Sequence, residues 1–193
     1  MHVSDIAPIG AIHGIACLIA LFAGAWNMVL RKGTGNHRAV GLAYMLSMVV
    51  VNISVFAMYR FDIASFQPFK AGPNIFGIFH WFAVWTLGFL AIGWYAASRQ
   101  ERALWAYLHP IMMVLTYYML LAGGINEMFV RVDVLKALAV ASAKGSQQFG
   151  QAPLIGMVHT GWMALVLLMI IWFSVRVFAW RWRDRRSARL ATA

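Results

Sequence analysis

Charge, acidic residues and cysteine are all scarce in this sequence, and each scarcity excludes a class of protein. Charged residues make up 11% of the 193 residues and hydrophobic residues 62%, which excludes an ordinary soluble domain and a disordered chain. Cys17 is the single cysteine, so an internal disulfide and any cysteine-rich zinc or iron–sulfur motif are excluded. Asp and Glu number six, and no apolar segment carries several charges, as the spans of ion pumps and proton-coupled carriers usually do.

Motifs of several large enzyme and transporter classes are also missing. The chain has no glycine-rich phosphate loop, no nucleophile elbow and no Ser-x-x-Lys sequence. It has no duplicated half of the kind that builds inverted-repeat transporters, and no alternating pattern typical of an outer-membrane barrel. No linker is long enough to divide the chain, so residues 1–193 are predicted to form a single domain.

Long apolar runs are the main feature that the sequence does have, and its mean hydropathy is +0.71. Runs of about 20 apolar residues are typical of membrane-spanning helices. Five such runs lie at about residues 9–30, 39–59, 74–97, 105–130 and 154–176. The predicted fold is therefore all-α: a polytopic membrane helical bundle with about five transmembrane helices.

The positions of the basic residues predict how the bundle is oriented. If the N-terminus is outside, eleven Lys and Arg residues lie in cytoplasmic segments and five in outer segments, as the positive-inside rule expects. The net charge of +10 thus follows from membrane topology and does not indicate nucleic-acid binding. The C-terminal sequence WRWRDRRSAR predicts contact with anionic lipid headgroups on the cytoplasmic side. The long connection 131–153 predicts a short helix on the outer surface.

Three of the five runs carry a histidine shortly after a proline. The pairs are Pro8 and His13, Pro73 and His80, and Pro153 and His159. Proline is favoured in the first turn of a helix, and all three helices would begin at the outer surface. At 1.5 Å per residue, the three imidazoles then lie about 8–11 Å below the helix starts. A buried imidazole without a partner costs free energy, so we expect the three rings to meet inside the bundle.

Small residues beside these histidines predict which helix faces point inward. In the first run the predicted inward positions are His13, Cys17, Ala20, Gly24 and Asn27. In the third run they are Gly77, His80, Val84, Gly88 and Ala91. Small residues at helical spacing allow membrane helices to approach closely.

Glu127 is the candidate fourth member of this site. Pro110 indicates that the fourth span begins near residue 110, which would put Glu127 about one turn inside the outer boundary. Three imidazoles and a carboxylate suit a transition metal such as zinc, iron or copper. We therefore predict that His13, His80, His159 and Glu127 are metal ligands, with Glu127 alternatively a catalytic base acting on metal-bound water.

Haem b is the other cofactor that the histidines allow. Two of the three outer imidazoles would be axial ligands, and the protein would transfer electrons to or from a quinone. His37 and His109 form a second and weaker group toward the cytoplasm, with Asn27 and Tyr44 in their vicinity. This group can be either a pair of haem ligands or two solvated surface histidines.

The stretch from residue 13 to residue 44, HGIACLIALFAGAWNMVLRKGTGNHRAVGLAY, carries a resemblance to a known family. The shared pattern is an early histidine followed by Lys-Gly-x-x-x-His-Arg-x-x-Gly-x-x-Tyr, here His13, Lys32, Gly33, His37, Arg38, Gly41 and Tyr44. The chain thereby resembles the bacterial predicted membrane proteins named domain of unknown function 2306. The resemblance implies a multi-pass helical protein of the bacterial inner membrane. It implies no activity. On this resemblance, His37 and Arg38 have only structural roles, in a turn and in a contact with lipid.

Three functions follow from the sequence and stay open at this point. The first is an inner-membrane protein with a transition-metal site near the periplasmic face, which performs redox or hydrolytic chemistry on a small hydrophobic or periplasmic substrate. The second is a haem b electron-transfer protein that interacts with quinone. The third is a non-catalytic subunit of a membrane complex, in which the histidines only bond neighbouring helices.

Overall fold

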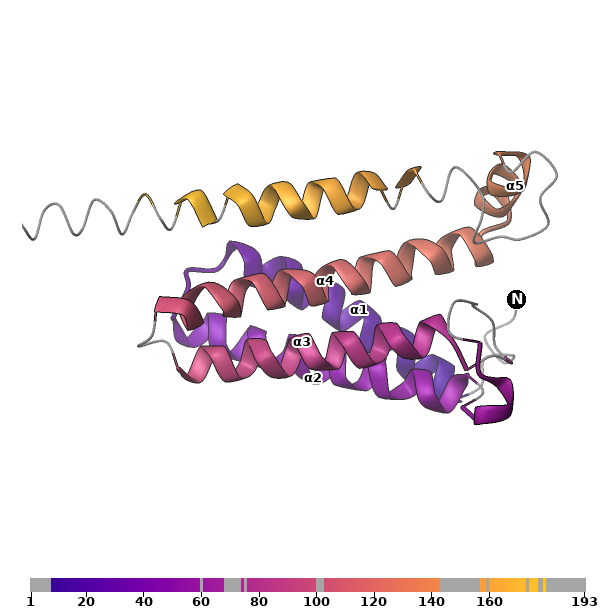
Figure 1. Ribbon diagram of the computed structural model, residues 1–193, viewed down its shortest axis with the longest axis horizontal. Helices are drawn as coiled ribbons and strands as arrows, with labels where there is room; N and C mark the ends of the chain where they lie inside the picture. The colour runs from indigo at the N-terminus through magenta and orange to yellow at the C-terminus, as the bar shows by residue number, and fades with distance from the viewer. Residues whose placement is uncertain are drawn as a thin grey trace, which may run out of the picture.

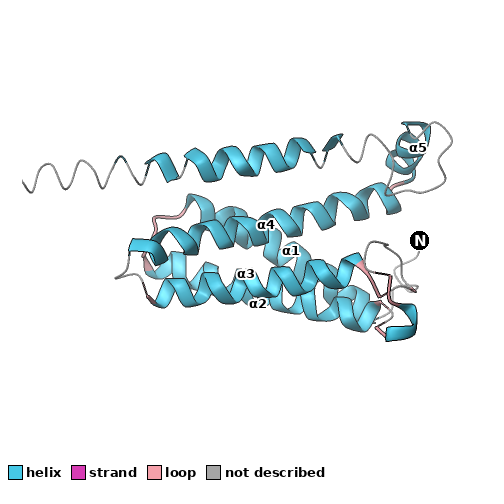
Figure 2. Cartoon of the chain, viewed as in Figure 1, coloured by secondary structure: helices cyan, strands magenta, loops and turns pink. Residues whose placement is uncertain are grey.

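The computed structural model describes residues 8–59, 61–67, 74, 76–99, 103–142, 157–158, 160–172, 174–176 and 179. Four long helices form an antiparallel bundle: α1 (Pro8–Val29), α2 (Gly35–Met58), α3 (Ile78–Ser98) and α4 (Ala103–Arg131) (Figure 1). The short 3-10 helix η2 (Ile63–Ser65) lies between α2 and α3, and α5 (Asp133–Ser142) follows α4. Within the described ranges the structure is helical, apart from turns and one isolated bridge between Phe66 and Phe76 (Figure 2).

Four of these helical segments are long and apolar enough to cross a membrane. They are α1, α2, α3 and the part of α4 from Tyr107 to Ile125. These helices correspond to the first four predicted apolar runs. In the region of the fifth, the structure has a shorter apolar helix, Thr160–Arg176, and the rest of the predicted span lies outside the described residues. The short helix predicted in the connection after α4 is present as α5.

The helix starts agree with the proline signals at only one of the positions described. Pro8 is the first residue of α1, as predicted. Helix α3 begins at Ile78 with Gly77 as its N-cap, so its start is set five residues after Pro73. Helix α4 begins at Ala103 and continues through Pro110, but its segment that is apolar enough to cross a membrane begins at Tyr107, close to the predicted start of the fourth span near residue 110. The residues before Pro110 are good helix formers, and a proline removes one backbone hydrogen bond without having to end a helix.

The four helices occupy the corners of a square. Helix α1 packs on α2, α2 on α3, α3 on α4, and α4 on α1. The diagonal partners are therefore α1 with α3, and α2 with α4. We name the two ends of the bundle by their connections: the turn end contains residues 30–34 and the start of α4, and the η2 end contains the starts of α1 and α3. In Figure 1 the η2 end lies near the label N.

The core lies on the square's axis and contains Ala20, Tyr44, Met48, Leu90 and Leu120. Ala20 and Gly24 are buried in α1, as the small-residue pattern predicts. For α3 the pattern is wrong beyond His80: its buried positions are His80, Ala83, Thr86, Leu90, Gly93 and Ala96. Val84, Gly88 and Ala91 are exposed on the opposite face. A membrane helix is apolar all round, so small residues alone do not identify its buried face.

Candidate functional site

His13 lies in the contact between α1 and α2 and is bound to a serine. Its Nδ1 is 2.7 Å from Ser54 Oγ. The Ser54 hydroxyl donates to the carbonyl of Val51 at 2.8 Å, so it accepts from the His13 Nδ1–H. Ser54 is buried. The imidazole therefore joins two neighbouring helices.

His80 is enclosed at the η2 end by an aromatic box, which we define as Phe56, Tyr59, Phe61 and Phe76. The four ring centroids lie 4.9 to 6.3 Å from the centroid of the imidazole, and His80 is 1% exposed. Phe61 and Phe76 come from the connection between α2 and α3, which is held by the main-chain hydrogen bonds of Phe76 with Ser65 and Gln67. The imidazole of His80 is therefore packed against four aromatic rings in an otherwise apolar position.

The hydrogen bonding of His80 assigns it a structural role at the start of α3. Its Nδ1 accepts the main-chain N–H of Gly77, the N-cap residue, at 3.3 Å. Since Nδ1 is an acceptor, the neutral ring carries its proton on Nε2. The main chain of Tyr59 also lies within electrostatic range of the ring, yet Nε2 has no hydrogen-bond partner among the described residues. In this tautomer His80 offers no lone pair to a metal.

In the structure, His13 and His80 contact different residues. They lie on diagonal helices, and they contact α2 at Ser54 and at Phe56 to Tyr59 respectively. These contacts are two to five residues apart along α2, or about 3–8 Å at 1.5 Å per residue. Ser54 and Phe56 also lie on nearly opposite faces of that helix, because residues two apart on a helix do not face one another.

Of the other two predicted ligands, His159 and Glu127, the structure describes only the main chain of Glu127. His159 and the side chain of Glu127 lie outside what the structure describes. The main chain of Glu127 belongs to α4, beyond the apolar segment Tyr107–Ile125. In the described part of the chain no three His, Cys, Asp or Glu side chains are grouped to hold a metal. The four-ligand metal site stays a prediction.

A first test concerns the aromatic box. His80→Ala is expected to lower the free energy of unfolding by about 2–4 kcal/mol, because it leaves a cavity among four rings and removes the Gly77 cap. Thermal unfolding in detergent measures this. Trp81→Ala is the control, since Trp81 is adjacent in sequence and 40% exposed, and it should cost well under half as much. Equal loss in both variants would contradict the capping role.

At the turn end lie His37 and His109, the second and weaker group that the sequence analysis predicts. Tyr44 of α2 and Thr116 of α4 meet across the diagonal of the square, with their hydroxyl oxygens 2.8 Å apart. His37 is seven residues before Tyr44, and His109 is seven residues before Thr116. Seven residues are nearly two helical turns, so each histidine lies on the same helix face as its partner in the core. Both imidazoles therefore lie about 10 Å closer to the turn end, and they are near enough to influence each other electrostatically.

His109 is held in a fixed orientation by α3. Its Nδ1 lies 2.9 Å from the carbonyl oxygen of Gly93, and it must donate because a carbonyl only accepts. The proton is therefore on Nδ1, and the lone pair is on Nε2. A histidine whose second nitrogen donates to a main-chain carbonyl is the usual form of a metal-binding imidazole.

His37 and Asn27 place two unpaired acceptors beside His109. The His37 ring lies against the main chain of Asn27 and within electrostatic range of His109 and Lys32. Its Nδ1 is buried and has no partner among the described residues, and the same is true of Asn27 Oδ1. Buried polar atoms in native proteins nearly always have partners. These two atoms make the cluster a candidate binding site.

The turn that carries His37 is fixed by its own hydrogen bonds and is basic. Gly33 has φ of 80°, a conformation that favours glycine, and the Thr34 hydroxyl accepts the His37 main-chain N–H at 3.3 Å. Lys32 Nζ donates to the carbonyls of Asn27 at 2.7 Å and Met28 at 2.9 Å, at the end of α1. Partial burial there lowers the pKa of Lys32 below its ordinary value. Arg31 and Arg38 are exposed beside it.

All four helices thus contribute to one site, which we call the turn-end cluster: Asn27 from α1, His37 from α2, the Gly93 carbonyl from α3, and His109 from α4. The sequence contains a signal for this cluster, because His37 precedes Tyr44 and His109 precedes Thr116 by the same seven residues. Comparison with protein families, with curated proteins and with solved structures found no match for the chain. The resemblance of residues 13–44 to a family therefore stays a prediction.

Proposed function

We propose that this chain is a membrane electron-transfer protein that binds haem b at the turn end, with His37 and His109 as axial ligands. The observation that supports this most is the contact of Tyr44 with Thr116, because His37 and His109 each lie seven residues before one of these two hydroxyl groups. Haem b held by the bundle needs two such imidazoles from facing helices. The unpaired Nδ1 of His37 and the lone pair on His109 Nε2 are the two donor atoms.

The two glycines near the cluster differ in the room that they leave for a macrocycle. Gly41 of α2 and Gly93 of α3 have no side chains of their own. The positions that a Cβ would take lie 3.1 Å from Asn27 Nδ2 at Gly41, and 3.1 Å from Met113 Sδ at Gly93. Asn27 Nδ2 is the end of a flexible side chain and can turn away, so a flat ring can approach the backbone of Gly41. At Gly93 the Cβ of Met112, at 3.2 Å, and the main-chain oxygen of His109, at 3.7 Å, also lie close, because α3 and α4 are packed against each other there.

The charge at this end also fits. Haem propionates are anionic, and the turn end carries Arg31, Lys32 and Arg38 close to the level of the cluster. By the positive-inside rule this end faces the cytoplasm of a bacterial inner membrane. When bound, haem supplies a one-electron ferric–ferrous couple. The chain's part is to orient His109 through Gly93, to exclude water from the axial ligands, and to balance the propionate charge.

A transition metal at the η2 end is the second candidate. It keeps the ligand set His13, His80, His159 and Glu127 with redox or hydrolytic chemistry, and its support is that His13 and His80 lie at the same end of the bundle. Binding there requires His80 to release Gly77 and place a lone pair on Nε2. A non-catalytic subunit is the third candidate, and the His13–Ser54 bond supports it.

The deciding experiment is the absorption spectrum and elemental analysis of the full chain, purified from cells supplied with iron and haem precursor. Haem b at about one per chain, with a Soret band that shifts on reduction, is the expected result. A colourless protein with one equivalent of zinc, copper or non-haem iron would replace the haem proposal with the metal site. A protein that contains neither haem nor metal would support the third candidate, a non-catalytic subunit.

A further inference from the structure

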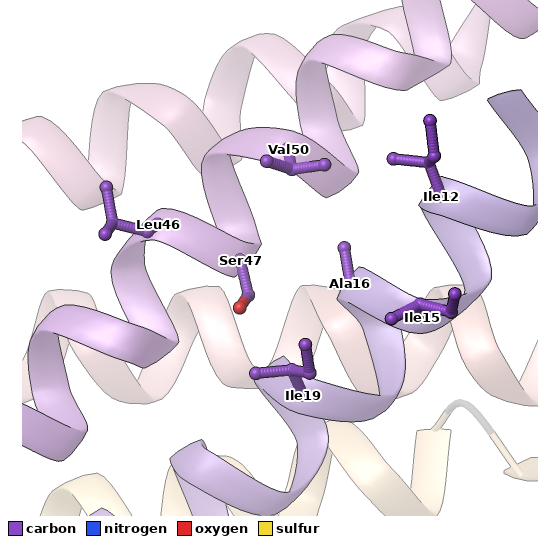
Figure 3. Close-up of a pocket in the computed structure, with 7 residues that line it drawn as sticks. All are labelled: Ile12, Ile15, Ala16, Ile19, Leu46, Ser47 and Val50. Atoms are coloured by element: carbon purple, nitrogen blue, oxygen red, sulfur yellow. The ribbon is translucent and has the colours of Figure 1, made fainter.

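A groove on the membrane-facing side of α1 and α2 forms a second candidate site. It has a volume of about 290 Å³ and is open along one side. Figure 3 shows its lining, with Ile12, Ile15, Ala16 and Ile19 from α1, and Leu46, Ser47 and Val50 from α2. The isoleucines, Leu46 and Val50 are exposed at the rim, and Ala16 is buried at the base. Ser47 is the one polar side chain in this lining.

Ser47 differs from every other buried hydroxyl residue that the structure describes. Ser54, Ser65, Thr86 and Thr116 each donate to a main-chain carbonyl three or four residues earlier. Such bonding is the usual way for a helix to satisfy a serine or threonine in an apolar setting. Ser47 is 8% exposed, none of the hydrogen bonds among the described residues involves its side chain, and its oxygen is not one of the fully buried atoms that lack a partner. Its oxygen points into the groove (Figure 3).

The depth of Ser47 restricts what can satisfy it. It is the thirteenth of the 24 residues of α2, so it lies near the middle of an apolar span. No water is available in the hydrocarbon region, and an unsatisfied hydroxyl there costs several kcal/mol. The acyl chain of a phospholipid has no hydrogen-bonding atom at this depth. A ligand in this groove must therefore be apolar and must have a hydrogen-bond acceptor at the depth of Ser47, near the centre of the bilayer.

The size of the groove favours a small molecule over another helix. On α1 it extends from Ile12 to Ile19, or about 10 Å at 1.5 Å per residue. Its volume is at the lower limit of small-ligand pockets. A helix of a second chain would need a contact along several more turns, with small residues throughout.

We propose that this groove binds the ring of a membrane-soluble quinone, whose carbonyl oxygen accepts a hydrogen bond from the Ser47 hydroxyl. The quinone tail then lies along the exposed isoleucines, in contact with lipid. The choice of a quinone, among carbonyl compounds that dissolve in the bilayer, rests on the proposed electron-transfer function. Ser47 is ten residues from His37 on α2, about 15 Å along the helix axis, so the two sites are separate.

Decylubiquinone is the probe. It is titrated into the purified full chain in detergent, and its competition against a photoreactive azido-quinone is followed by mapping labelled peptides. Labelling is expected on residues 12–19 and 46–50. Ser47→Ala should weaken binding about five- to tenfold, which corresponds to one hydrogen bond. Val50→Phe should weaken it more than tenfold, because it fills the groove.

Ile53→Phe is the matched control, since Ile53 is also exposed on α2 but lies outside the groove, and it should bind as the unaltered chain does. Equal affinity for Ser47→Ala and the unaltered chain would overturn the proposal. So would labelling elsewhere, or a Val50→Phe variant that converts an oligomer to a monomer without changing quinone binding. Haem content is measured in parallel: its absence with intact quinone binding contradicts only the haem proposal, and the reverse contradicts only this one.

Discussion

His109→Leu is expected to lower the haem content of the purified protein more than tenfold. The substitution removes one axial ligand and also the hydrogen bond to the Gly93 carbonyl that orients it. His37→Leu should have the same effect, because a pair of axial imidazoles on diagonal helices acts as a unit. The Soret absorbance per mole of protein, together with extraction of the haem, measures both variants.

The control for this experiment is His13→Leu, which is at the opposite end of the bundle and should retain haem. Helix content by circular dichroism and elution in gel filtration show whether each variant is folded. Haem retained at full occupancy in folded His37→Leu and His109→Leu would exclude the turn-end cluster. If His13→Leu instead loses non-haem metal, the ligand set at the η2 end is supported.

Gly24→Ala is expected to destabilise the bundle by about 2–3 kcal/mol. A Cβ at this position would lie 2.5 Å from two carbons of the Tyr117 ring and 3.0 Å from the Tyr44 ring. Neither ring moves freely, since Tyr117 donates to the carbonyl of Leu21 at 3.1 Å and Tyr44 bonds Thr116. Inserting atoms into such a packed position typically costs 1–3 kcal/mol, and lost hydrogen bonds add to that.

Gly14→Ala provides a control on the same helix. Nothing lies within 4 Å of the position that its Cβ would take, so stability should change by less than about 0.5 kcal/mol or rise slightly with helix propensity. Thermal unfolding of the two variants in the same detergent is the measurement. Similar melting temperatures for Gly24→Ala and Gly14→Ala would show that the tyrosines adjust, and that the α1 contact is looser than the structure indicates.

The four spans could be predicted closely because hydrophobic length is a property of the sequence itself. The predicted run at 9–30 corresponds to Pro8–Val29, and that at 105–130 to Ala103–Arg131. Pro110 marks the start of the apolar segment Tyr107–Ile125 to within three residues, but it does not begin α4, which starts seven residues earlier at Ala103.

Side-chain partners were predicted less well, because depth does not determine direction. The sequence placed His13 and His80 at similar levels, and both do lie at the η2 end. Their partners differ, with Ser54 for the first and an aromatic box for the second. The box depends on Phe61 and Phe76, which a loop folds back over α3, and no local pattern around residue 80 reveals that.

The sequence by itself determined that this is a helical chain suited to a membrane, where its first four spans lie, and which connections are basic. These follow from hydrophobic length and charge, and both can be read without knowing which helices touch. Only the tertiary structure decided that α2 and α4 are diagonal partners, and hence that His37 and His109 lie at one level of the bundle while His13 and His80 have separate neighbours. The reason is that a helix apolar on every side has no hydrophobic stripe to specify its inner face, so close packing and a few polar contacts such as Tyr44 with Thr116 choose it.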